Sequence, residues 1–205
     1  MKLLFSIILL IFSINSVFSS RNETIILTPY KDSDCTEFGG GVGYGYMPNV
    51  PNSNIIRVFG NIYDTFEFKE SSNGEILLMN ILGSNGKIIK TESFNIKKCQ
   101  YSQFLKTYYL FDTEINIPTP SIQFNQWATG SNSDSFNGEC MVDVYETFNF
   151  IANDTIINLP YIQSTQQFYC INDSPYLKSC QENSGCYTNQ LTSCFDGEYK
   201  ATCIN

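Results

Sequence analysis

Hydrophobic and polar residues alternate with a period of two over much of the chain between residues 24 and 171. In the segment 56–69, most apolar side chains fall on even positions and most polar side chains fall on odd ones. Because successive side chains of a β-strand point to opposite faces, this pattern predicts a half-buried strand, or two short strands around Gly60.

Two Asn-Gly pairs separate the apolar runs that follow. Asn73-Gly74 stands before the run 75–82, and Asn85-Gly86 stands before the run 87–97. Such pairs favour hairpin turns of type I′, in which both central residues take a positive φ. Residues 55–98 are therefore predicted to form a three-stranded antiparallel meander.

Three more strands are predicted at 101–111, 140–150 and 166–171, and the polar segment 130–138 is predicted to be an exposed loop. No apolar stripe of helical period longer than two turns follows the N-terminal segment. We expect an all-β fold, an antiparallel β-sandwich or open barrel with a disulfide-rich C-terminal cap.

The N-terminal segment has the features of a secretory signal peptide. Lys2 precedes an apolar run at 3–14, and small residues follow up to Ser19 and Ser20. The apolar run is too short to span a bilayer. We expect a signal peptide at 1–19, an antiparallel β domain at 20–169 and a cysteine-rich segment at 170–205 packed on that domain. The protein is accordingly expected to be secreted and extracellular.

Eight cysteines follow this segment, and an even number in a secreted chain predicts a disulfide framework. They are Cys35, Cys99, Cys140, Cys170, Cys180, Cys186, Cys194 and Cys203. Three precede residue 170 and five lie from Cys170 onward. If all eight pair within the chain, at least one bond must join the two segments. That bond is expected to involve Cys140 or Cys170.

Composition narrows the classes of function. The chain has 12 basic residues, 20 acidic residues and no histidine, which gives a net charge of −8. An anionic surface disfavours nucleic acids and membrane surfaces as partners. Histidine-dependent nucleophiles and histidine-ligated zinc are excluded, and no C-x-x-C occurs. We expect no catalytic residue, no metal site and no cofactor.

Glycines are concentrated in the segment 39–46. Its spacing fits neither the dinucleotide fingerprint nor the P-loop, which needs Gly-Lys-Ser/Thr. We expect a mobile or bulged connection, with Tyr44 and Tyr46 packed down onto the protein.

Acidic residues are close together at Asp32, Asp34 and Glu37. A calcium loop would need glycine at position 37, so solvated loop carboxylates are favoured, as they are for Asp134 and Glu139. A glycosidase needs only two carboxylates and no histidine. The sequence neither excludes such a pair nor identifies one.

Three sequons, at Asn22, Asn153 and Asn172, predict glycosylation in a secreted chain, with Pro175 close to the third. The single tryptophan, Trp127, is expected to be a core anchor. Tyrosines could replace tryptophan as a platform for sugars, so glycan binding stays open.

The spacing Tyr30-x-Asp32-x-x-Cys35, the all-β middle and the cysteine-dense C-terminus together resemble the counting-factor-associated proteins of the A/B/C type from social amoebae. The similarity covers most of the mature chain. It implies an extracellular protein linked to a secreted complex that regulates cell-group size. The resemblance implies no catalytic residues.

Our leading hypothesis is a non-enzymatic, secreted, disulfide-bonded glycoprotein that binds an extracellular protein or glycan partner. Two alternatives remain, a carboxylate-dependent glycan-active enzyme and a secreted protease inhibitor. Paired carboxylates in a cleft would favour the enzyme. A rigid, exposed loop between two cysteines would favour the inhibitor.

Overall fold

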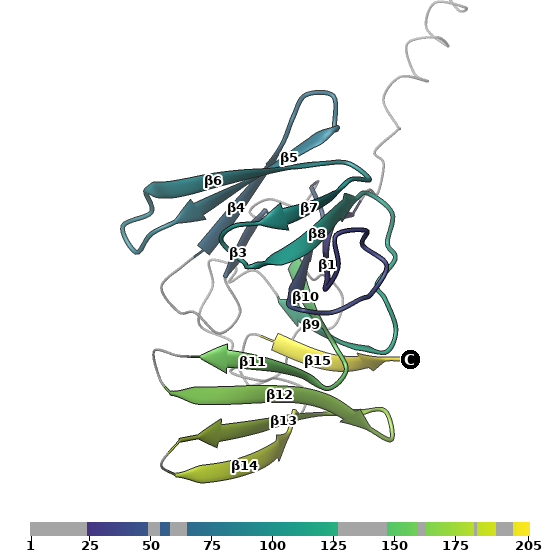
Figure 1. Cartoon of the computed structure of the whole chain (residues 1–205), viewed down its shortest axis with the longest axis vertical. Coiled ribbons are helices and arrows are strands. Elements are labelled where there is room, and N and C mark those ends of the chain that lie inside the picture. Colours follow the sequence, from purple (N-terminus) through teal and green to yellow (C-terminus); the bar gives the residue numbers. More distant parts are fainter. Residues whose placement is uncertain are drawn as a thin grey trace, which may run out of the picture.

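The computed structural model of the chain describes residues 24–48, 54–57, 65–126, 147–159, 163–182, 184–191 and 199–205. Every regular element among them is a β-strand, and neighbouring strands run antiparallel (Figure 1). The expected all-β, antiparallel fold class is confirmed.

The strands form one large sheet and two smaller ones. The seven-stranded sheet has the order β15–β9–β10–β2–β1–β8–β7, with β1 Ile25–Tyr30, β2 Val42–Tyr46, β7 Cys99–Ser102, β8 Thr107–Asp112, β9 Ser121–Gln126, β10 Thr147–Ala152 and β15 Tyr199–Ile204. The β3–β6 sheet comprises β3 Ile55–Arg57, β4 Thr65–Glu70, β5 Ile76–Leu82 and β6 Ile88–Asn95. The β11–β14 sheet comprises β11 Thr155–Leu159, β12 Ser164–Ile171, β13 Ser174–Gln181 and β14 Gly185–Gln190.

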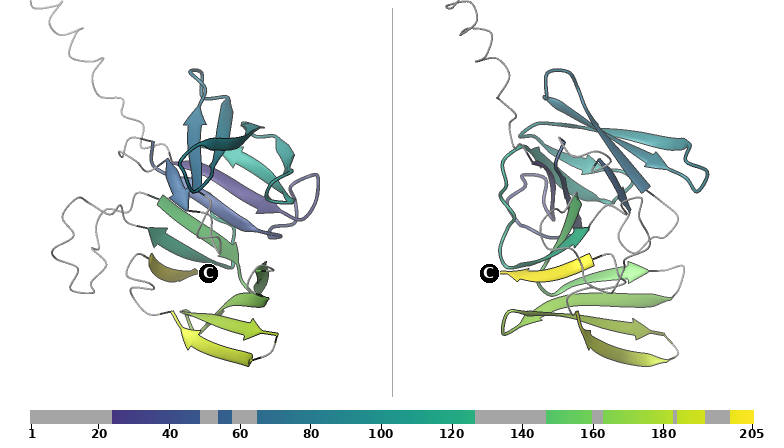
Figure 2. Two further views of the ribbon diagram at one scale, coloured as in Figure 1. Left: turned by 90° about the vertical axis from the view of Figure 1, so that its left-hand side faces the viewer. Right: turned by 180° about the vertical axis from the view of Figure 1, so that it is seen from behind.

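Both smaller sheets pack on the same face of the seven-stranded sheet. Tyr44 and Phe124 lie opposite the same β10 residue, so their side chains share a face. Tyr44 meets Phe66 of β4 edge-on at 5.3 Å between ring centroids, and Phe124 meets Phe168 of β12 at 5.4 Å. One continuous core therefore joins all three sheets, with the β3–β6 and β11–β14 sheets at opposite ends of the molecule (Figure 2).

The glycine-rich segment is a buried central strand, so the expectation of a mobile or bulged connection is wrong for Val42–Tyr46. The expected packing of Tyr44 and Tyr46 is confirmed, since both are buried. Gly43 and Gly45 lie on the opposite face, directly beneath the rings of Phe150 and Phe148 of β10. A glycine within a strand often marks such a close approach.

The predicted meander is confirmed in its order and turn positions, and its first run forms the two separate strands β3 and β4, the second of the two alternatives predicted for that segment. The expected type I′ turns are wrong. In each Asn-Gly pair only the glycine has a positive φ, 70° at Gly74 and 71° at Gly86. The Oδ1 atom of Asn85 accepts the Lys87 N–H at 3.0 Å, so the asparagine stabilises the turn through its side chain.

The segment 101–111, predicted as one strand, is a hairpin of β7 and β8. Lys106 takes a φ of 60°, and its N–H donates to the Ser102 carbonyl at 2.9 Å, which reverses the chain. The predicted strand at 166–171 lies within β12. Of the predicted strand at 140–150, the structure describes 147–150, which belong to β10. The loop predicted at 130–138 lies outside the described residues.

Strands continue through the cysteine-rich C-terminal segment, which contains β13, β14, β15 and the end of β12. Leu177, Leu191 and Ala201 from this segment are buried in the main core. β15 pairs with β9 at the edge of the seven-stranded sheet, so backbone hydrogen bonds hold the C-terminal strand to the rest of the protein.

Three disulfides lie among the described residues, namely Cys35–Cys99, Cys170–Cys203 and Cys180–Cys186. The first joins the loop after β1 to β7, and the third lies across the β13–β14 hairpin. The second connects β12 to β15 and thereby two different sheets. Cys170 thus pairs within the C-terminal segment, which leaves Cys140 as the predicted link between the two segments.

The close approach of Gly43 and Gly45 to two phenylalanine rings predicts that neither position tolerates alanine. A Cβ would lie 2.2 Å from the Phe150 ring at Gly43 and 2.1 Å from the Phe148 ring at Gly45. Because both rings are buried, we expect Gly43→Ala or Gly45→Ala to lower the free energy of unfolding in urea by about 1–3 kcal/mol. Gly83→Ala is the matched control, since its Cβ meets the exposed Ile89 side chain at 3.3 Å, and a change within about 0.5 kcal/mol is expected. Equal effects at all three glycines would contradict the packing.

Counting the cysteines predicts the fourth disulfide. Cys140 and Cys194 lie outside the described residues, and the other six cysteines are paired. If all eight pair within the chain, Cys140 must bond to Cys194, which provides the expected link between the two segments. Peptide mapping without reduction should recover one peptide pair that contains both residues. Two alkylatable thiols in the unreduced protein would refute the prediction.

Candidate functional site

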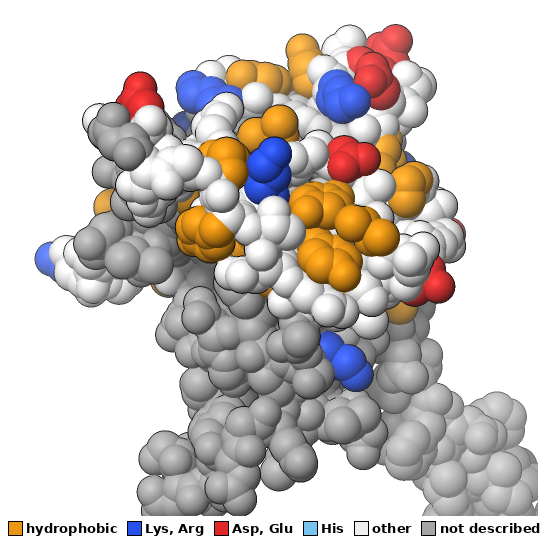
Figure 3. All heavy atoms as spheres, turned by 90° about the horizontal axis from the view of Figure 1, so that it is seen from below, with side chains coloured by type: hydrophobic (Ala, Val, Ile, Leu, Met, Phe, Trp, Pro, Cys, Tyr) orange, Lys and Arg blue, Asp and Glu red, His pale blue; other side chains and the backbone are white. Residues whose placement is uncertain are grey.

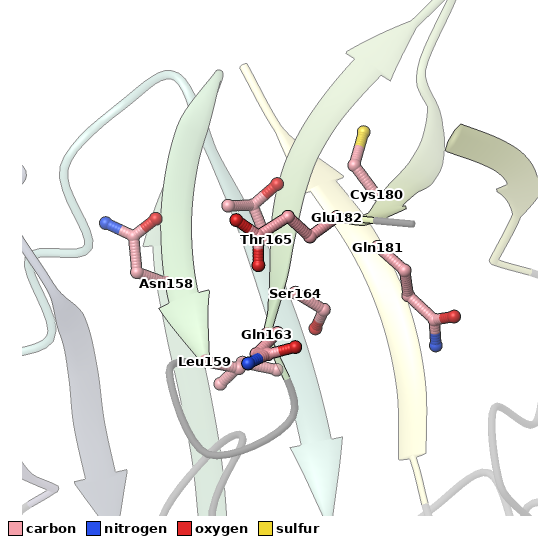
Figure 4. Close-up of a pocket in the computed structure, with 8 residues that line it drawn as sticks. All are labelled: Asn158, Leu159, Gln163, Ser164, Thr165, Cys180, Gln181 and Glu182. Atoms are coloured by element: carbon pink, nitrogen blue, oxygen red, sulfur yellow. The ribbon is translucent and has the colours of Figure 1, made fainter. Parts of the chain in front are cut away.

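A shallow, open pocket of about 370 Å³ lies where β11 ends, β12 begins and β13 ends (Figure 4). The strand register places Leu159, Ser164 and Gln181 side by side there. The N–H of Glu182 donates to the Gln163 carbonyl at 3.2 Å and extends the β12–β13 pairing past the strand ends. The lining residues are Asn158, Leu159, Gln163, Ser164, Thr165, Cys180, Gln181 and Glu182.

The pocket presents hydrogen-bonding groups of several kinds. Its lining includes three side-chain amides, two hydroxyls and one carboxylate. Figure 4 shows the side chain of Glu182 extending toward Thr165. Ser164 is only 7% exposed, and its Oγ has no hydrogen-bond partner. A buried hydroxyl without a hydrogen-bond partner is costly in free energy.

A row of side chains runs from this pocket along the outer face of the β11–β14 sheet. The register pairs Thr165 with Cys180, then residues 167 with 178, then Tyr169 with Tyr176, all on one face. The two tyrosine rings stack with centroids 5.7 Å apart and an interplanar angle of 13°. Figure 3 looks onto this end of the molecule and shows hydrophobic side chains in separate groups, with basic and acidic side chains between and around them.

The acidic cluster at Asp32 stabilises its own loop. The Thr36 hydroxyl donates to Asp32 Oδ2 at 2.6 Å, and the Glu37 N–H donates to Oδ1 at 2.8 Å. Glu37 pairs with Lys31 Nζ at 2.8 Å. The Thr36 hydroxyl, followed by the Glu37 N–H, lowers the pKa of Asp32 from 3.8 to about 2.

The structure places two of the three sequons at turns. Asn172 is exposed in the β12–β13 turn, where it and Asp173 both have positive φ, which is the type I′ geometry. Asn153 is partly buried at the corner between β10 and β11, and its Oδ1 accepts the Cys170 N–H at 2.8 Å. Glycosylation of both, and of Asn22 outside the described residues, stays a prediction.

Several candidate residues lie outside the described part of the chain, namely Trp127, Asp134 and Glu139. Within the described ranges, no three Asp, Glu or Cys side chains gather in a group that could hold a metal ion. No helix in that part of the chain is long and apolar enough to cross a membrane.

Of the two alternative functions, the glycan-active enzyme gains no specific observation among the described residues, whereas the inhibitor would require a disulfide-closed loop such as the exposed one between Cys180 and Cys186. The pocket contains a single carboxylate, that of Glu182, whereas glycoside hydrolysis generally uses two. The loop closed by Cys180–Cys186 is short, and its Ser184 N–H donates to the Gln181 carbonyl at 3.2 Å, as in a β-turn. Sequence reasoning did not find the pocket, because its residues are common polar types at strand ends and form no motif.

These features define the class as an all-β, disulfide-bonded protein with a polar pocket on one of its smaller sheets. A family model described as counting factor-associated protein A/B/C matches residues 1–205, the whole chain. The chain belongs to this family, as the resemblance at Tyr30, Asp32 and Cys35 implied. Neither the curated proteins nor the solved structures include a significant match.

The hydrogen bonds at Asp32 predict that its carboxylate stays deprotonated to a lower pH than an ordinary aspartate. A lowered pKa means that Asp32 stabilises the folded state fully above pH 3.8 and loses this effect as the pH falls through about 2. Carboxyl-carbon NMR should show Asp32 titrating near 2. In Thr36→Val the pKa should rise toward 3.8, because the hydroxyl bond is its largest cause. Thr188→Val, at an exposed position of β14, should leave it unchanged. A wild-type pKa near 3.8 would contradict this account.

Proposed function

We propose that this protein is an extracellular, non-enzymatic component that binds a partner within a secreted counting-factor complex. The observation that carries the proposal is the family match over residues 1–205. The disulfides add support, because such bonds persist in oxidising compartments such as the secretory route and the extracellular medium.

The surface chemistry supports binding in preference to catalysis. The pocket on the β11–β14 sheet offers amides, hydroxyls and a lone carboxylate without the histidine base on which most activated nucleophiles depend. Such groups form hydrogen bonds to a partner and need no cofactor. The net charge of −8 favours partners that are neutral or basic at the contact surface.

Association with the complex is tested in conditioned medium from cells that make the protein. A tagged mature chain, residues 20–205, should elute from a sizing column well above the mass of the single chain. Peptide mass spectrometry should identify counting-factor subunits in the same fractions. These subunits should also be retained when the chain is captured through its tag.

The matched control is the same tagged chain after reduction and alkylation, which breaks the disulfides while keeping the sequence. It should lose the counting-factor subunits, because binding depends on the folded surface. Elution of the folded chain as a monomer, with no counting-factor subunit retained, would contradict the proposal.

A further inference from the structure

We propose that the pocket and the tyrosine pair of the β11–β14 sheet together form a binding site for a neutral glycan. This inference rests on the proposed partner-binding function and names the chemical class of one ligand. In this site the pocket forms hydrogen bonds to the hydroxyl groups of one sugar. The stacked tyrosines pack against the apolar face of a neighbouring sugar ring.

The polar groups of the pocket match the hydroxyl groups of a sugar. A pyranose presents several adjacent hydroxyls, each of which both donates and accepts a hydrogen bond. The side-chain amides of Asn158, Gln163 and Gln181 can do both, and the Glu182 carboxylate can accept from two neighbouring hydroxyls. The pocket is shallow and open, so a sugar at the end of a longer chain can enter it.

The hydroxyl of Ser164 is buried beside the pocket. Ser164 is one of the residues that line the pocket, and its Oγ is shielded from solvent and lacks a hydrogen-bond partner. Buried polar atoms in folded proteins are nearly always bonded to protein or ordered water, so an exception calls for an explanation. A ligand hydroxyl that replaces water at this position would satisfy it.

A row of side chains continues from the pocket along the outer face of the β11–β14 sheet. Along β12, Thr165 and Tyr169 lie four residues apart, which corresponds to about 13 Å. Gln167 lies between them on the same face, opposite Lys178. This length accommodates more than one sugar ring, and the Tyr169–Tyr176 pair supplies the aromatic surface on which the C–H face of a sugar packs.

The distribution of charged residues on this sheet also favours a neutral ligand. The chain carries 20 acidic residues, yet Lys178 is the sole charged residue at the outward positions of β11–β14. Glu182 in the pocket disfavours anionic sugars, because a second negative charge beside it would be repelled. A surface of amides and tyrosines, with one lysine and one carboxylate of opposite charge, complements a neutral glycan.

The test begins with the mature, disulfide-bonded protein on an array of neutral oligosaccharides printed beside sialylated and sulfated counterparts. We expect binding to at least one neutral structure and weaker binding to its charged counterparts. The best neutral oligosaccharide is then titrated by calorimetry to about 10 mM, well above a dissociation constant of about 1 mM.

Two variants probe the two halves of the site. Glu182→Gln keeps the side-chain shape at an exposed position and should weaken binding about tenfold, because it replaces a charged hydrogen-bond acceptor. Tyr176→Ala removes one ring of the stacked pair and should weaken binding by roughly five- to tenfold. Far-UV circular dichroism and the thermal midpoint confirm that both variants are folded.

Matched controls lie elsewhere on the surface. Tyr187→Ala removes an exposed tyrosine on the opposite face of the sheet, and Glu114→Gln removes an exposed carboxylate next to the seven-stranded sheet. Both should bind the glycan as the unmodified protein does. Equal losses in controls and site variants would overturn the assignment, and so would the absence of any neutral ligand at the highest concentration. If the chain still co-purifies with counting-factor subunits in that case, only the glycan site is wrong.

Discussion

Nearly everything in this fold depends on one face of the seven-stranded sheet burying the aromatic side chains of three sheets. Tyr44 and Tyr109 from this face meet Phe66 of β4 and Phe94 of β6, while Phe124 meets Phe168 of β12. Fully burying a large apolar side chain contributes about 1.5–3 kcal/mol, so these contacts outweigh any single polar interaction at the surface.

The opposite face of the same sheet explains why glycine alternates with tyrosine in β2. Phe148 and Phe150 form a second, smaller cluster there with Ile26, and they occupy the space above Gly43 and Gly45. The glycines therefore allow β10 to place two large rings over its neighbour. The tyrosines at the alternate positions fill the main core.

The Cys170–Cys203 disulfide fixes the candidate site relative to this core. It closes a segment with a sequence separation of 33 and joins the β11–β14 sheet to the seven-stranded sheet. In the chain-entropy description, such a bond contributes about 3–4 kcal/mol by restricting the unfolded chain. Phe168 is buried two residues before Cys170, so covalent and apolar contacts fix the same part of β12. The outer face of that sheet, with Tyr169 and Tyr176, is therefore presented on a rigid support.

The sequence by itself determined the fold class, the β3–β6 meander and the disulfide character, because period-two patterning, Asn-Gly turns and cysteine number act locally or by simple counting. It could not determine the role of residues 42–46, since glycine suits either a loop or a strand until the rings of Phe148 and Phe150 are placed above it. Only the tertiary structure decided that β9 pairs with β15 and β1 with β8, pairings that join strands far apart in the chain. The candidate site has the same origin. Asn158, Ser164 and Glu182 are ordinary polar residues in sequence, and they form a pocket because three strand ends meet in one register.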